Sequence, residues 1–398
     1  MNWRFGKKEL YLQQNKILKP NDMKKTTVFL ALMGALLLTA CGPKKGEQAP
    51  SRSTEAQAML AKMKAAAEGH KVMFGHQDDT AYGHTWAGIA APQEQDADAS
   101  TEGRSDTKEV CGDYPAVIGF DLGRLELGHK RNLDGVLFDK MRREIIAHYE
   151  RGGIVTLSWH LDNPLTGNDA WDFHDKGTAA SILPDGKLHE EFLTRMGRVA
   201  DFLASIKTAD GTPVPMLFRP WHEHTGSWFW WGQDICTTEQ YKGLWRMTYD
   251  FMQARGLTNL LWAYSPGTEP TTQEEYFERY PGDDIVDVLG FDTYQYGPRE
   301  PYLATMKRSL DILVEAAKTH GKVAAVTETG FESTPDPTWW TGTLLPALGD
   351  APVAYVLVWR NAWDRETHHY GIYPGHESEA DFVEFYKNPR TLFAKDIQ

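Results

Sequence analysis

The sequence lacks the features by which several classes of protein are recognised. Basic residues are in the minority, because 42 Lys and Arg stand against 55 Asp and Glu, and they are scattered along the chain. A nucleic acid is therefore not the expected partner, since phosphate binding needs a basic face. No Gly-x-Gly-x-x-Gly follows the first predicted strand, which argues against a dinucleotide site. No linker, repeat or low-complexity stretch follows residue 54, so we expect one domain over 55–398.

Cysteine is also scarce, with three residues in 398. Cys111 precedes a predicted strand and Cys236 follows another, which would place them at opposite ends of a barrel. A disulfide needs Cα atoms within about 7 Å of each other. We therefore expect Cys111 and Cys236 to remain unpaired.

The apolar run near the N-terminus is too short for a comfortable membrane span. From Met23 the chain reads MKKTTVFLALMGALLLTACG, the layout of a secretory signal. Its ending, Leu-Thr-Ala-Cys, resembles a bacterial lipobox, so we predict a lipoprotein signal peptide over 23–40 and lipid attachment at Cys41. Residues 1–22 are then an upstream extension, and 41–54 form an acylated tether.

A lipid anchor with several acyl chains would hold the protein on a membrane, because a single chain holds only marginally. Bacteroides-type lipoproteins that are exported to the surface carry an acidic run after the lipidated cysteine. No such run follows Cys41 in this sequence. We therefore expect a membrane-anchored, periplasm-facing protein rather than one on the cell surface, and a monomer.

The rest of the chain alternates between two textures. Eight short runs are almost continuously apolar, which is typical of strands buried on both faces. They cover 71–77, 116–122, 153–161, 215–223, 257–266, 286–294, 322–330 and 353–362. Between them lie stretches with apolar residues at helical spacing. The clearest are 55–68, 135–150, 189–208, 238–255 and 301–319. Eight strands alternating with helices predict an α/β fold, a single (β/α)₈ TIM barrel.

Polar residues gather at the C-terminal ends of the predicted strands, where the active sites of such barrels lie. They are His76, Asp121, His160, Glu223, Asp292, Glu328 and Arg360. Glu223 ends the fourth strand and Glu328 the seventh, so the two face each other across the barrel. Glycoside hydrolysis needs such a pair, one to protonate the leaving oxygen and one to attack or to activate water.

The segment RPWHEHTGSWFWWG surrounds Glu223. Its His-Glu-His could suggest a metal, but on a strand the two histidines point one way and the glutamate the other, and no His-Glu-x-x-His is present. We predict no metal and no cofactor. The segment's four tryptophans suit a cleft in which sugar rings stack, with Trp221 and Trp230 expected in the core.

This segment resembles the acid/base signature of glycoside hydrolase family 26, whose best-known members are β-mannanases. The resemblance also includes SWHLDNP at 158–164, GFDTYQ at 290–295, TETG at 327–330 and VWRN at 358–361. It implies a retaining endo-β-1,4-mannanase that acts on β-mannan, with Glu223 as acid/base and Glu328 as nucleophile. It also implies substrate contacts from His160, Trp171, His222, Trp228, Asp292, Tyr294, Trp359 and Arg360. From its position two residues past Asp292, Tyr294 could hydrogen-bond and orient the nucleophile.

Three alternatives stay open. The resemblance also includes family relatives whose barrel cleaves mixed-linkage β-glucan or β-1,3-xylan, and the sequence discriminates poorly because the axial 2-hydroxyl of mannose is read by geometry. The chain could be a non-catalytic glycan-binding lipoprotein, although both strand-end glutamates are present. It could also be a metal-dependent hydrolase, which chelation would test.

Overall fold

Eight parallel strands close into a barrel in the computed structural model, which describes residues 52–86 and 101–398. β1 pairs with both β2 and β8, so the sheet has no free edge within the barrel. Every residue of these strands is buried, as their continuous apolarity predicts. The strands are β1 (Val72–Gln77), β2 (Val117–Asp121), β3 (Ile154–Ser158), β4 (Met216–Arg219), β5 (Leu260–Tyr264), β6 (Val288–Asp292), β7 (Val323–Thr329) and β8 (Tyr355–Val358). The predicted (β/α)₈ barrel is confirmed.

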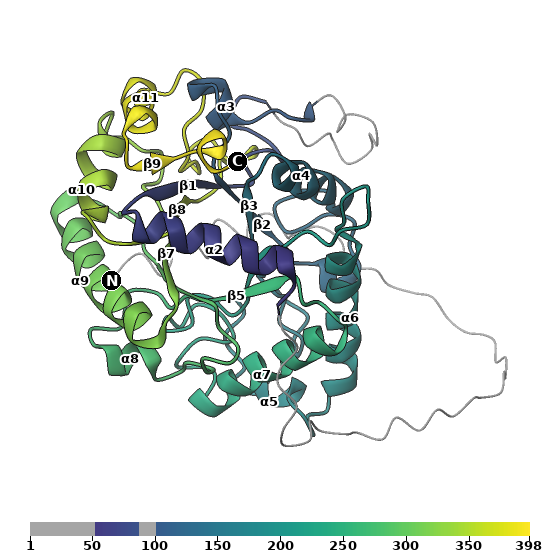
Figure 1. Ribbon diagram of the computed structural model, residues 1–398. Coiled ribbons are helices and arrows are strands. Elements are labelled where there is room, and N and C mark those ends of the chain that lie inside the picture. The colour runs from purple at the N-terminus through teal and green to yellow at the C-terminus, as the bar shows by residue number, and fades with distance from the viewer. Residues whose placement is uncertain (1–51, 87–100) are drawn as a thin grey trace. The chain divides into compact units, whose positions relative to one another are not determined.

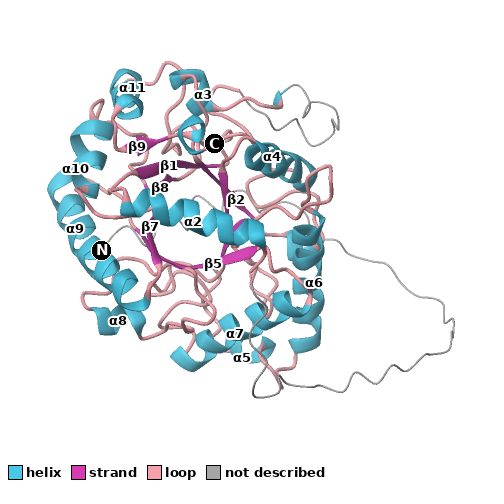
Figure 2. Cartoon of the chain, in the orientation of Figure 1, coloured by secondary structure: helices cyan, strands magenta, loops and turns pink. Residues whose placement is uncertain are grey.

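Helices surround the barrel (Figures 1 and 2). The five predicted helices are present, with boundaries shifted by up to three residues. The α-helices are α2 (Thr54–Glu68), α3 (Asp106–Cys111), α4 (Phe138–Glu150), α5 (Thr178–Ile182), α6 (His189–Ser205), α7 (Thr238–Ala254), α8 (Gln273–Phe277), α9 (Arg299–His320), α10 (Leu345–Leu348) and α11 (Glu379–Lys387). Shorter elements are the 3₁₀ turns η2 (Leu125–Leu127) and η4 (Ala394–Ile397), the π-helical turn η3 (Trp340–Leu344), and β9 (Thr391–Leu392), which pairs with β1.

Helix α2 closes the N-terminal end of the barrel, across which it runs in Figure 1. Its apolar face, centred on Met59 and Met63, packs with side chains that fill the barrel interior, such as Leu261 and Ala325. A second, larger apolar cluster fills the space between the sheet and the outer helices. With this end closed, the opposite end of the barrel carries the site.

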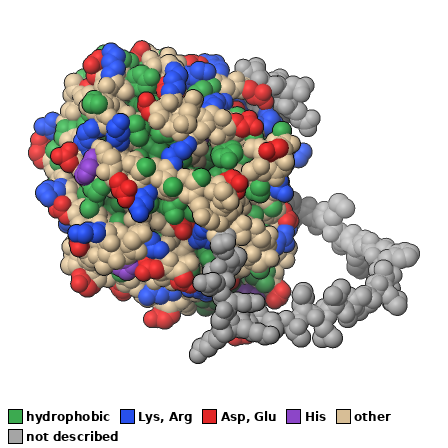
Figure 3. All heavy atoms as spheres, in the orientation of Figure 1, with side chains coloured by type: hydrophobic (Ala, Val, Ile, Leu, Met, Phe, Trp, Pro, Cys, Tyr) green, Lys and Arg blue, Asp and Glu red, His purple; other side chains and the backbone are tan. Residues whose placement is uncertain are grey.

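The surface has no single-sign patch on the face that carries α2, where acidic and basic side chains are interspersed (Figure 3). Within the described ranges, no helix has both the length and the apolarity needed to cross a bilayer. The signal peptide and Cys41 lie outside the described residues.

Cys111 and Cys236 are both free thiols, so the prediction that they do not pair is confirmed.

Candidate active site

Three carboxylates meet at the C-terminal end of the barrel. Glu328 lies on β7, Asp292 ends β6, and Glu223 lies in the loop after β4. One oxygen from each lies within 4.8 Å of the others, and all three residues are buried. A separation of about 5 Å between two carboxyl groups is typical of retaining glycosidases, while inverting enzymes space them more widely. The predicted pair is therefore brought together at the spacing that suits a covalent glycosyl-enzyme.

Glu328 is held from two sides. Arg219, the last residue of β4, donates to its Oε1, and the Tyr294 hydroxyl donates to its Oε2 over 2.6 Å. Burial, together with the charges of Glu328 and Glu223, raises the pKa of Tyr294, so its phenol keeps the proton that it donates. The predicted hydrogen bond from Tyr294 to the proposed nucleophile is confirmed.

Arg219 also joins two of the carboxylates to each other. Its Nη1 lies 2.8 Å from Asp292 Oδ2, and its side chain is 2% exposed. Burial alone would lower the pKa of Arg219, but Asp292 and Glu328 outweigh it and raise the pKa. The three clustered carboxylates are close enough to bind a cation, and the guanidinium already supplies a positive charge to two of them.

Sequence reasoning missed Arg219 as a site residue. The signal was available, because Arg219 is a charged residue at the end of a buried apolar strand, the criterion that selected the other strand-end residues. A buried charge at such a position needs partners. Its partners are the nucleophile candidate and Asp292.

Asp292 differs from the sugar contact that we expected. Its side chain is completely buried and accepts hydrogen bonds from Arg219 and from the Thr327 hydroxyl, the latter over 2.6 Å. Because this side chain has no exposed surface, Asp292 presents no oxygen to a sugar in this structure. We therefore assign Asp292 to the support of Arg219 rather than to direct substrate binding.

Glu223 lies four residues beyond β4, not at the end of a strand as predicted. The backbone of its turn is unusual, with left-handed φ angles of 57° at Trp221 and 50° at Glu223. Each such non-glycine residue costs about 1–2 kcal/mol, and strain of this kind concentrates at functional sites. The turn brings the Glu223 carboxylate to Trp228, whose Nε1 donates to Oε2 over 2.6 Å.

This turn also separates the two histidines that flank Glu223. His222 Nε2 lies 3.2 Å from His160 Nε2, beside the carboxylates. His224 instead packs between Tyr241 and Tyr264, with ring centroids 4.4 and 4.9 Å away. The prediction that they point the same way was wrong, because the segment is a turn with left-handed backbone at Trp221 and Glu223 rather than an extended strand.

His160 is anchored below by Asp121, which ends β2. His160 Nδ1 lies 2.6 Å from Asp121 Oδ2. Burial alone would lower the pKa of His160, but the Asp121 carboxylate raises it above the ordinary value. The ring of Trp171 stacks on His160 at a centroid distance of 5.2 Å, and the ring of Trp359 meets it edge-on at 6.0 Å. These predicted residues therefore form one aromatic group beside the catalytic candidates.

The four tryptophans around Glu223 are more deeply buried than we expected. Trp221 and Trp230 lie in the core as predicted, but Trp231 is also fully buried and donates its indole N–H to the His222 carbonyl. Trp228 is only partly buried. A sugar can therefore stack on Trp228 but not on the other three.

Two of the strand-end residues lie apart from the carboxylates. His76 is fully buried and pairs with Asp79, 2.7 Å away. Arg360 pairs with Asp134 at 3.0 Å and donates to the Tyr82 hydroxyl at 3.1 Å. Contact between Arg360 and a sugar stays a prediction.

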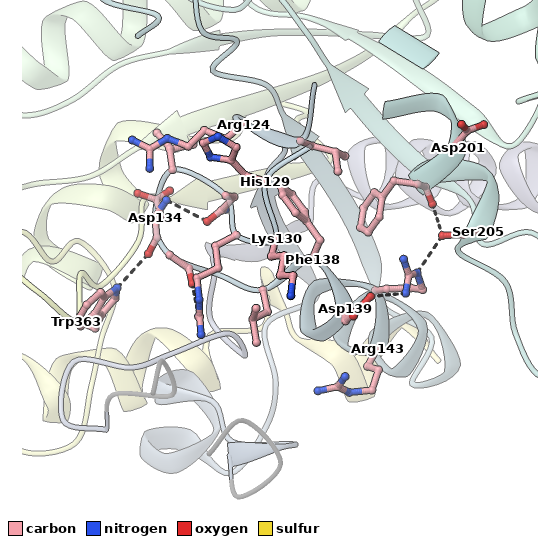
Figure 4. Close-up of a pocket in the computed structure, with 18 of the residues that line it drawn as sticks. Arg124, His129, Lys130, Asp134, Phe138, Asp139, Arg143, Asp201, Ser205 and Trp363 are labelled. Carbon is pink, nitrogen blue, oxygen red and sulfur yellow. Dashed lines mark hydrogen bonds and ion pairs between the residues drawn. The ribbon is translucent and has the colours of Figure 1, made fainter. Parts of the chain in front are cut away.

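Asp134 also borders a cavity of about 1430 Å³ lined by the loop after β2 and by α4 and α6 (Figure 4). Trp363, in the loop after β8, points toward Asp134 and donates its indole N–H to the Asp134 carbonyl over 3.0 Å. None of the three clustered carboxylates lines this cavity. The chemistry of the side chains, rather than the hollow, identifies the candidate active site.

Comparisons with known proteins agree with this geometry. The model of glycosyl hydrolase family 26 matches residues 48–377. The solved structure of a GH26 β-mannanase from Bacteroides ovatus is 52% identical, with a TM-score of 0.82, over 87% of this chain and 96% of that one. The catalytic domain of a Bacillus sp. JAMB-750 GH26 endo-β-1,4-mannanase is 29% identical, with a TM-score of 0.77, over 89% of this chain and 97% of that one.

A curated relative, a mannan endo-1,4-β-mannosidase from Bifidobacterium adolescentis, is 33% identical over 74% of this chain. The match spans 32% of that protein's own length.

Proposed function

Because the chain belongs to glycosyl hydrolase family 26, we propose that it is a retaining endo-β-1,4-mannanase. It hydrolyses β-mannan, galactomannan or glucomannan to short manno-oligosaccharides. The observation that carries the proposal is the pair of Glu223 and Glu328, whose carboxylate oxygens lie within 4.8 Å of each other. The relatives named as mannan endo-1,4-β-mannosidases support β-mannan as the substrate over β-glucan or β-1,3-xylan.

In the first step, an oxygen of Glu328 attacks the anomeric carbon of the sugar. The glycosidic C–O bond breaks, and the carboxyl proton of Glu223 passes to the leaving oxygen. In the second step, Glu223 takes a proton from water, the water oxygen attacks the anomeric carbon, and the bond to Glu328 breaks. Two inversions at one carbon give net retention.

Different neighbouring side chains orient each of the two glutamates. Arg219 and Tyr294 fix the orientation of the Glu328 carboxylate for attack. The Trp228 indole N–H fixes the Oε2 oxygen of Glu223, the residue that supplies the transferred proton. Preorganised donors of this kind cost no reorganisation during the reaction.

Sugar binding on either side of the cleaved bond is assigned to aromatic and basic side chains, most of them around the carboxylates, with Arg360 farther away beside Asp134. His222 and His160 lie beside them, and Tyr294 touches Glu328. The proposed substrate contacts are His160, Trp171, His222, Trp228, Tyr294, Trp359 and Arg360.

A substrate panel tests the proposal. Reducing-sugar release is measured on galactomannan, glucomannan, lichenan and β-1,3-xylan, with the Glu328→Gln variant as the control for contaminating activity. We expect release from the two mannans only, unchanged after exhaustive chelation. Faster release from lichenan or β-1,3-xylan, or binding without release, would support one of the alternatives instead. Product profiles on mannohexaose then separate endo attack from chain-end attack.

We also propose that the protein is a monomeric lipoprotein, anchored through Cys41 and facing the periplasm. The lipobox-like sequence before Cys41 supports this location. Labelling with a palmitate analogue should mark the wild-type protein and spare Cys41→Ala, and protease should cut it only after the outer membrane is opened. Cleavage on intact cells would place it on the surface. Light scattering after chromatography tests the monomer.

A further inference from the structure

Arg279 lies in the loop between α8 and β6 and is buried without a carboxylate partner. The residue is 2% exposed, and its guanidinium donates to three backbone carbonyls. Within residues 52–86 and 101–398 it forms no ion pair. Burying a charge without a counter-charge is costly, so its presence needs a reason other than stability.

The three carbonyls that Arg279 binds all belong to the loop between β4 and α7. Nη1 donates to the His224 carbonyl over 2.6 Å, and Nη2 donates to those of Trp231 and Cys236 over 3.3 and 2.9 Å. This loop carries Glu223, whose peptide bond adjoins His224. One buried side chain therefore ties three points of the loop to a different part of the barrel.

Arg279 also contacts the groups that satisfy the neighbouring carbonyls of the turn. The guanidinium carbon lies 4.2 Å from the ring centroid of Tyr241, whose hydroxyl donates to the Trp221 carbonyl over 2.8 Å. Trp231, whose own carbonyl accepts from Arg279, donates its indole N–H to the His222 carbonyl over 2.9 Å. The donors to the Trp221 and His222 carbonyls thus contact this arginine, and the donor to the His224 carbonyl is the arginine itself.

The turn needs such support because its backbone is strained. Trp221 and Glu223 both have left-handed φ angles, which non-glycine residues adopt only where the surroundings impose them. If the turn relaxed, the Glu223 carboxyl would leave its place beside Trp228 and Glu328. A displacement of about 1 Å can lower a catalytic rate roughly 100-fold.

We propose that Arg279 is a positioning residue for the acid/base group: it holds the turn that aims the Glu223 carboxyl at the glycosidic oxygen. This inference rests on the proposed function. It assigns to Arg279 no contact with the substrate, and it predicts a defect confined to the proton transfers of Glu223.

The test compares two substrates on Arg279→Met and Arg279→Lys. Cleavage of mannohexaose requires an acid to protonate the departing sugar oxygen. An aryl β-mannobioside has a dinitrophenolate leaving group, which departs without protonation. We expect Arg279→Met to lower kcat/KM on mannohexaose about 10- to 100-fold, within the range of general acid catalysis, and to leave kcat/KM on the aryl substrate within about threefold. Azide should raise kcat of the variant on the aryl substrate, because it replaces the water that Glu223 activates.

Arg198→Met is the matched control, since Arg198 also donates to a backbone carbonyl of a βα loop, that of Glu126, over 2.6 Å. It should change neither the substrate ratio nor the azide response. Equal losses on both substrates in a folded Arg279 variant, or no loss on either, would overturn the proposal. If Arg279→Met does not fold, the test passes to Arg279→Lys, which keeps the charge but not the forked donors. This variant must then show the split, a larger loss of kcat/KM on mannohexaose than on the aryl substrate.

The proposed function can fail separately. A wild-type protein that is inactive on mannohexaose contradicts the mannanase assignment. The same pair of leaving groups is then compared on the β-glycan that the wild type does cleave, and the split still decides the role of Arg279.

Discussion

Replacing Tyr294 by Phe removes a single hydrogen bond, 2.6 Å long, from the Glu328 carboxylate. Arg219 still binds the other oxygen of Glu328, so the carboxylate should stay in the site. A hydrogen bond to a charged group contributes about 1.5–3 kcal/mol. If that contribution is lost in the transition state, kcat/KM should fall roughly 10- to 150-fold, since about 1.36 kcal/mol corresponds to a factor of ten.

The fall in Tyr294→Phe should be similar on mannohexaose and on an activated aryl β-mannobioside, because the nucleophile acts on both. Tyr302→Phe is the control. The Tyr302 hydroxyl shares a 2.7 Å hydrogen bond with the hydroxyl of Thr329, which lies on β7 like Glu328, and it contacts none of the three carboxylates. Tyr302→Phe should lower the free energy of unfolding by about 1 kcal/mol and leave kcat/KM unchanged. A Tyr294→Phe enzyme with wild-type kcat/KM, or one impaired only on mannohexaose, would refute the role given to this hydrogen bond.

Three further perturbations separate chemistry from stability. Glu223→Ala should lower kcat/KM on mannohexaose about 10²- to 10⁴-fold, keep activity on the activated aryl substrate and respond to azide; loss on both substrates in the folded variant would contradict its acid/base role. Asp121→Asn tests the pairing with His160 by urea unfolding at several pH values. Because the pKa of His160 is raised in the folded state, its stabilisation is fully present below the unfolded value of 6.5 and is lost as pH rises through the folded pKa. Because the pKa of Asp121 is lowered, its stabilisation is present above the unfolded value of 3.8 and is lost as pH falls through the folded pKa. The difference between wild type and variant should therefore be largest between about pH 4 and 6.5, and a difference that does not change with pH would exclude the pairing as its cause. Met63→Ala should lower the free energy of unfolding by about 2–5 kcal/mol because Met63 is fully buried in the closed end of the barrel, with kcat/KM unchanged; a loss below about 1 kcal/mol would mean that α2 does not seal the core.

The sequence was sufficient for the barrel and for the two glutamates, because both follow from local patterns. Continuous apolarity marks strands buried on both faces, and the structure buries every residue of the eight strands. Strand order then places Glu223 and Glu328 on facing sides. The hydrogen bond from Tyr294 also followed, since alternate residues near the end of β6 share a face.

The features that could not be predicted depend on tertiary contacts. The sequence around Glu223 does not indicate left-handed backbone at two non-glycine residues. Hydrogen-bond donors from other parts of the chain stabilise this conformation. The full burial of Trp231 has the same origin, because its indole is needed to satisfy the His222 carbonyl. Arg279 lies 56 positions after Glu223, in a segment with no motif, so that only the folded chain reveals its contact with the acid/base loop.

The central claim is that Glu328 forms a covalent bond with the sugar while Glu223 transfers protons. A fluorinated mannosyl substrate with a good leaving group slows the second step and lets the glycosyl-enzyme accumulate. Mass spectrometry of the digested protein should then find the sugar on the peptide that contains Glu328, and Glu328→Gln should carry none. A sugar attached to another residue, or full turnover with no adduct and an inverted first product, would contradict the account.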